Sequence, residues 1–131
     1  MEKERTWIRR LSHKPHVLEL VRRRLGCQCP EEVFDHYQVQ YINCGDIPVV
    51  QLIMGRKLLI RMVDAPRLTG AVEPLSELLD QGRRERDRRR LNRFRLVVTG
   101  PLPALTPTET DALQPFLGER VHLHIMAGLD F

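Results

Sequence analysis

The cysteines are the residues of this chain best suited to carry chemistry. Cys27 and Cys29 are separated by one residue on a predicted turn between two helices, and Cys44 is the third. We expect Cys29 at a helix N-terminus, because Pro30 suits the first helical turn. The positive end of the helix dipole would then favour the thiolate of Cys29, so Cys27 and Cys29 should differ in reactivity. Two thiols of unequal reactivity suit redox exchange, and thiolates suit zinc, copper(I) or iron–sulfur clusters.

A histidine pair could complete such a metal site. His122 and His124 alternate on a predicted strand, so their rings share one face with backbones roughly 6.5–7 Å apart. The predicted metal ligands are therefore Cys27, Cys29, Cys44, His122 and His124. Cys-x-Cys is not the Cys-x-x-Cys spacing of structural zinc sites, and no second pair follows. The alternatives are cysteines that simply pack in the core and histidines on a solvated face.

A run of arginines is the second candidate site. Eight arginines and two acidic residues fall between positions 81 and 96, so this segment has a net charge of +6. The whole chain has a net charge of +4, so the remainder carries −2. Guanidinium groups bind phosphates well, which predicts salt-sensitive binding of RNA or DNA. The alternatives are an acidic protein partner and a solvated helix end, since aromatic residues make up only 5%. The arginines expected to contact such a ligand are Arg83, Arg86, Arg90, Arg93 and Arg95, the first four as one helical stripe.

Composition is that of an ordinary globular protein. The chain has 131 residues, of which 42% are hydrophobic and 29% charged, enough for one domain with its own core. The longest apolar run, 47–54, is too short to cross a bilayer, and no apolar stretch follows the charged N-terminus. An odd number of cysteines argues against a disulfide framework. We therefore expect a cytoplasmic protein with reduced thiols and no membrane segment.

The hydrophobic pattern predicts the elements that must position these residues. Helical spacing marks 15–25, 68–79 and 106–117, and ion pairs could extend the second of these outward. A short helix should follow Pro30, and a helical arm should surround Trp7. Gly55 and Arg56 form a predicted two-residue hairpin loop. Alternating or continuous apolar patterns predict strands at 37–43, 47–54, 57–63, 93–99 and 121–126.

These elements predict a single domain over 1–131, with 1–14 as an N-terminal arm and 81–92 as a protruding arginine-rich helix end. We expect an α/β or α+β fold, a mixed sheet of about five strands with helices packed on it. The last two strands each follow a helix, so partly parallel pairing is expected. Strand order stays open.

Three functions follow from these features. The first is a small thiol protein that binds a soft metal or acts in thiol redox through the Cys-x-Cys turn. The second is a nucleic-acid-binding module that uses the segment Arg83–Arg95. The third is a non-catalytic interaction subunit. The chain contains no complete catalytic motif, so the sequence neither assigns nor excludes an enzyme, and it leaves the oligomeric state open.

Overall fold

A five-stranded mixed sheet organises the protein. The computed structural model describes residues 2–26, 31–68, 72–100 and 106–126. The strands lie side by side in the order in which they occur in the chain, and the first three are antiparallel while the last three are parallel. They are β1 (Tyr37–Cys44), β2 (Ile47–Met54), β3 (Leu58–Asp64), β4 (Arg93–Thr99) and β5 (Val121–Met126). The predicted mixed sheet of about five strands is confirmed.

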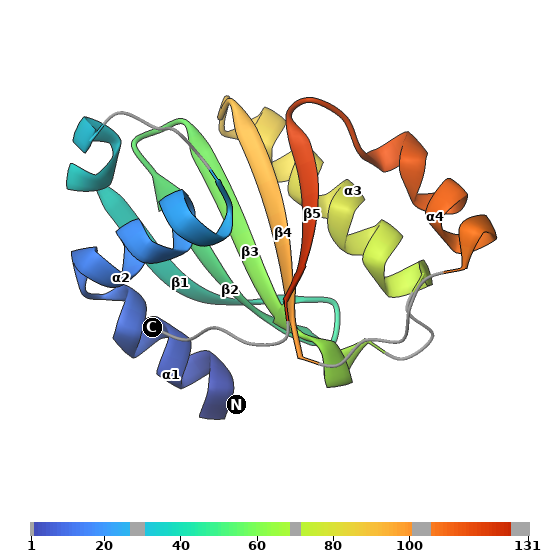
Figure 1. Ribbon diagram of the computed structural model, residues 1–131, viewed down its shortest axis with the longest axis horizontal. Helices are drawn as coiled ribbons and strands as arrows, with labels where there is room; N and C mark the ends of the chain where they lie inside the picture. The colour runs from blue at the N-terminus through green and yellow to red at the C-terminus, as the bar shows by residue number, and fades with distance from the viewer. Residues whose placement is uncertain (1, 27–30, 69–71, 101–105, 127–131) are drawn as a thin grey trace.

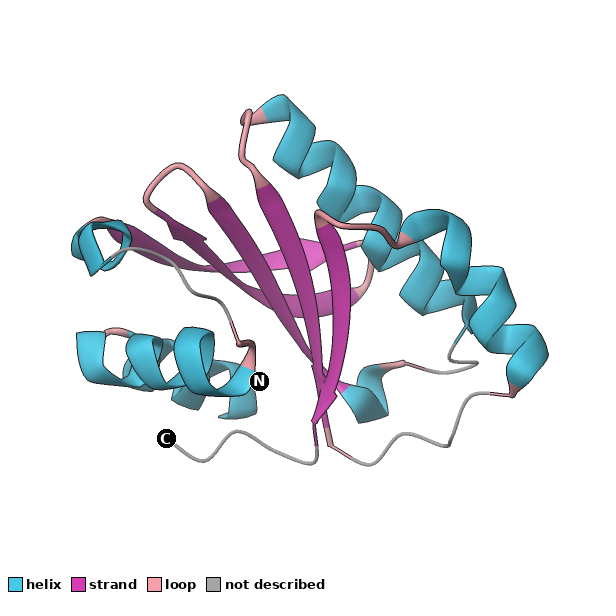
Figure 2. Cartoon of the chain, turned by 45° about the horizontal axis from the view of Figure 1, so that its top comes forward, coloured by secondary structure: helices cyan, strands magenta, loops and turns pink. Residues whose placement is uncertain are grey.

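Helices cover both faces of this sheet, as Figures 1 and 2 show. One layer holds α1 (Glu2–Leu11) and α2 (Lys14–Leu18), which continues as a π-helix over Glu19–Arg24. The other layer holds α3 (Val72–Arg88) and α4 (Pro107–Leu113). Short 3₁₀-helices complete the described structure at Glu31–Asp35, Ala65–Arg67 and Gln114–Phe116.

Alternation along the strands divides the interior into two cores. Leu52 and Ile60 face the α1 layer and pack with Trp7 and Leu11. Val49 and the neighbouring apolar residues of β3 and β4 face the α3 layer instead. Because β2 and β3 lie inside the sheet with helices on both sides, most of their residues are apolar, as the continuous pattern predicted.

Helix α3 still packs on the sheet after Leu79, the last buried leucine of the helix. Gly82 lies against the ring of Phe94 on β4, and a Cβ built at Gly82 would be 2.0 Å from Cζ of that ring. Leu91, in the loop after the helix, is also buried. The segment 81–92 therefore touches the sheet at these two positions. The helix itself ends at Arg88.

The remaining predicted elements differ from the structure at their ends. The helix expected over 106–117 begins with a capping box between Thr106 and Glu109, then narrows to a 3₁₀ turn after Leu113. Leu68, expected in a helix, is instead a buried residue that directly follows the 3₁₀ turn Ala65–Arg67. Within the described ranges, no helix is both long and apolar enough to cross a membrane.

Candidate functional site

Two loops from different parts of the chain meet at one end of the sheet. The β2–β3 turn contains Gly55, Arg56 and Lys57, and the other loop joins α3 to β4. The carbonyl of Lys57 accepts hydrogen bonds from the backbone N–H groups of Asn92, at 2.8 Å, and Arg93, at 3.0 Å. These bonds hold the basic side chains of the two loops at the same end of the molecule.

The backbone is left-handed at one arginine in each loop. Arg56, in the β2–β3 turn, has a φ of 58°, and Arg90, in the α3–β4 loop, has a φ of 57°. Gly55 also has a positive φ, 55°, so the hairpin turns through two consecutive left-handed residues, as a type I′ turn requires. This conformation disfavours a residue with a side chain, and such residues often mark functional sites. The turn was predicted from the sequence, but its arginine was not expected to contribute to a site.

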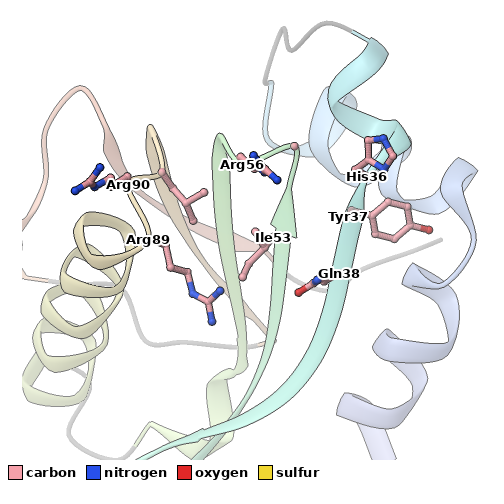
Figure 3. Close-up of a pocket in the computed structure, with 9 residues that line it drawn as sticks. His36, Tyr37, Gln38, Ile53, Arg56, Arg89 and Arg90 are labelled. Atoms are coloured by element: carbon pink, nitrogen blue, oxygen red, sulfur yellow. The ribbon is translucent and has the colours of Figure 1, made fainter.

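A concave pocket of about 550 Å³ opens between these loops and the start of β1 (Figure 3). Its volume lies within the range of about 300–1,000 Å³ that is usual for ligand sites. Ile53 and Leu91 supply apolar lining, and Gln38 supplies an amide. We call it the basic pocket, because its lining also includes Arg56, Arg89, Arg90 and His36.

Most arginines of α3 are already paired with acids of the same helix. Arg83 and Arg84 both contact Asp80, at 2.7 and 3.1 Å. Arg88 binds both carboxylate oxygens of Glu85, and Arg89 also donates to Glu85. These hydrogen bonds lower the pKa of the Glu85 carboxyl to about 2, and the bond from Arg88 contributes most. Burial opposes this shift. The positive charge of the helix is thus largely compensated where it lies.

The predicted helical stripe divides into separate groups. Arg86 is paired with Asp87 at 2.9 Å and donates to the carbonyl of Arg120. Arg90 and Arg93 lie beyond the end of α3, so they do not continue a helical face with Arg83. Within the part of the chain that the structure describes, the exposed Arg56, Arg90 and Arg93 form no ion pair.

Arg95 lies on the opposite face of the sheet from α3. It is only 6% exposed, and its Nη1 donates to the carbonyl of Leu25 at 3.2 Å and to Nε2 of His124 at 2.8 Å. Burial and then the charge of Arg95 lower the pKa of His124 to about 4, so this ring is neutral near neutral pH. Arg95 therefore does not join the other predicted arginines.

The histidine pair presents fewer metal ligands than its spacing suggested. The rings are 6.4 Å apart between centroids. Nε2 of His122 lies 2.8 Å from the carbonyl of Glu119, so it carries the proton and leaves Nδ1 as an acceptor. A guanidinium can only donate, so the lone pair of His124 Nε2 is occupied by Arg95. In this arrangement only His122 has a vacant lone pair.

Cys44 is far from that pair. It ends β1, one edge of the sheet, whereas His122 and His124 belong to β5, the other edge. Cys44 also packs in the core beneath α3, while His124 faces the opposite side with Arg95. Burial raises the pKa of the Cys44 thiol, and the nearby Arg61 offsets part of this effect. Cys44 cannot share a metal ion with the histidines.

The other two thiols, Cys27 and Cys29, lie outside the described residues, and the metal or redox role expected of them stays a prediction. Over the ranges described above, the structure contains no group of three or more histidine, cysteine or acidic side chains that could hold a metal ion.

Comparison with known proteins adds no functional assignment. No protein-family model matches the chain, and no curated protein matches its sequence. The candidate site therefore stands on its own geometry, which joins a pocket to arginines that have no acidic partner among the described residues.

Proposed function

We propose that this protein binds nucleic acid through its phosphate groups, at the basic pocket and the adjoining Lys57 and Arg93. One observation carries the proposal: the hydrogen bonds of the Lys57 carbonyl join the β2–β3 turn to the α3–β4 loop. Arginines distant in sequence, Arg56 and Arg90, thereby line one concavity without an acidic partner among the described residues. Uncompensated cations around a concave surface attract a polyanion.

The chemistry of the lining suits a nucleotide better than an acidic peptide. Arginine binds phosphate oxygens in pairs through its planar fork. The apolar Ile53 and Leu91 can contact the face of a base, and the amide of Gln38 can donate to and accept from a base edge. A peptide made of glutamate and aspartate would meet the same cations with its carboxylates, but it has no base to lie against the apolar Ile53 and Leu91.

Fluorescence anisotropy with labelled DNA and RNA oligonucleotides at low salt tests the proposal. We expect log K to fall linearly with log salt concentration, by about 0.7 for each contacted phosphate of a single strand. The double variant Arg56→Gln/Arg90→Gln should weaken binding about ten-fold or more and flatten this slope, because each lost charged contact contributes about 1.5–3 kcal/mol.

The matched control is Arg83→Gln/Arg84→Gln, which removes the same charge from arginines paired with Asp80. It should retain most of the affinity and the salt slope. Equal losses in the two double variants would mean that only net charge matters and would refute a site at the pocket. Absence of oligonucleotide binding, together with salt-sensitive binding of polyglutamate, would assign the pocket to an acidic protein partner instead.

A further inference from the structure

The basic pocket has two ends that differ in chemistry. Arg56 and Arg90 come from the two loops at the end of the sheet and form no ion pair within the described ranges. Arg89, Gln38 and Ile53 line the pocket further along the sheet, between α3 and β1 (Figure 3). This separation matches a nucleotide, in which the phosphate is charged and the base is neutral.

Arg89 is oriented by an acid of its own helix. Its Nε donates to Glu85, which also accepts from Arg88, and the Arg89 side chain is 35% exposed. The pKa of Glu85 is about 2, so this carboxylate is ionised at neutral pH. Nη1 and Nη2 of Arg89 donate to no described residue, so the outer end of the fork can bind two acceptors.

The charge of Glu85 distinguishes the two ends of the pocket. A phosphate that reached Arg89 would also approach this carboxylate, and the repulsion would offset part of the attraction. A base carries no charge and meets no such opposition. Arg56 and Arg90, which have no acid beside them among the described residues, are therefore the better ligands for phosphate, and Arg89 is available for a base.

Gln38 lies across the pocket from Arg89. Gln38 on β1 and Ile53 on β2 are partners in the strand register, so their side chains are neighbours on the face towards α3. Figure 3 shows Arg89 and Gln38 pointing into the pocket from α3 and β1, with Ile53 between them. A base that rests on Ile53 would therefore have a guanidinium at one edge and an amide at the other.

We infer that the pocket selects guanine in single-stranded RNA or DNA and that Arg89 determines this specificity, an inference that rests on the proposed binding of nucleic acid. Guanine presents two adjacent acceptors, N7 and O6, to a guanidinium fork, whereas adenine places a donor beside N7. The Watson–Crick edge of guanine carries N–H groups that can donate to the amide oxygen of Gln38. In single strands both of these edges are accessible to side chains.

Fluorescence anisotropy with labelled oligouridylates that carry one central guanosine, adenosine or cytidine tests the inference. We expect the guanosine oligonucleotide to bind about five-fold more tightly or more, because a bidentate contact of arginine with guanine discriminates by at least this factor. Arg89→Gln should lose the preference for guanosine and favour adenosine instead, since the glutamine amide matches the N6 and N7 edge of adenine.

The matched control is Arg88→Gln, which removes the same charge and another donor to Glu85 from a residue that does not line the pocket. It should keep the preference for guanosine. Equal affinity for the three oligonucleotides would overturn the inference and leave phosphate binding at Arg56 and Arg90 intact. A preference for another base, or one for guanosine that survives in Arg89→Gln, would overturn it as well. Absence of binding to all three would refute the proposed function together with it.

Discussion

Arg88 and Arg95 differ in what their guanidinium groups bind, although both belong to the same arginine-rich segment. Arg88 is exposed and chelates Glu85 one turn away on α3. Arg95 is buried on a strand, reaches a backbone carbonyl seventy positions earlier in the chain, and contacts a neutral histidine. The residue type supplies the same donors in each case, and the surroundings decide whether these donors meet an acid or a neutral group.

His124 provides a prediction at this scale. Its folded pKa of about 4 is lower than the ordinary value of 6.5, so the unfolded chain takes up a proton at higher pH than the folded chain does. The free energy of unfolding should therefore fall as the pH falls from 6.5 towards 4. Urea unfolding at a series of pH values measures this, and His124→Gln should show a flatter profile. A profile in His124→Gln as steep as that of the wild type would contradict the assignment, whereas His122→Gln should keep most of the dependence.

Helix α3 depends on a glycine for its contact with the sheet. Glycine in a helix interior is about 1 kcal/mol less favourable than alanine, so helix propensity alone favours replacement of Gly82. The ring of Phe94 fills the space that a side chain would occupy, because β4 approaches the helix closely at this point. The close approach also brings the end of α3 to the sheet, where the following loop joins the β2–β3 turn.

We predict that Gly82→Ala destabilises the protein. The new Cβ would be 2.0 Å from Cζ of Phe94, and overpacking of this kind costs about 1–3 kcal/mol, which exceeds the gain in propensity. Chemical denaturation measures the change, and Gln81→Ala, on the exposed neighbouring position, should be nearly neutral. Phe94→Leu should reduce the cost of Gly82→Ala in a double-mutant cycle. A more stable Gly82→Ala variant would contradict the close contact.

At the scale of the whole molecule, the sheet acts as a partition. Its first and last strands form opposite edges, and its two faces are covered by different helix layers. Residues that look like partners in the sequence are therefore held apart when they occupy different edges or faces. Cys44 and the histidine pair differ in both respects.

This separation gives a prediction about metal binding. Any soft metal held by Cys27 and Cys29 should be retained after Cys44→Ser. Cys44 packs in the core beneath α3, with its Sγ 3.5 Å from Nη1 of Arg61, whereas Leu25 packs in the core on the other face of the sheet. Metal content by mass spectrometry, on protein purified without chelator or oxygen, measures this. Cys29→Ser is the companion variant, and it should lose the metal. Loss of a bound metal in Cys44→Ser alone would contradict the prediction, and wild-type protein without metal would remove the metal role of the thiols.

The amino-acid sequence by itself determined the elements and the fold class, because hydrophobic periodicity, glycine turns and helix caps act over a few residues. The extents of β2 and β4, the Gly55-Arg56 turn and the parallel pairing after each later helix were all predictable in this way. Only the tertiary structure decided which arginines line the same pocket. Strand order and register placed Arg56 and Arg90 in the lining of one pocket, put Arg95 on the other face and separated Cys44 from His124. Such contacts depend on long-range packing, and no local pattern encodes them.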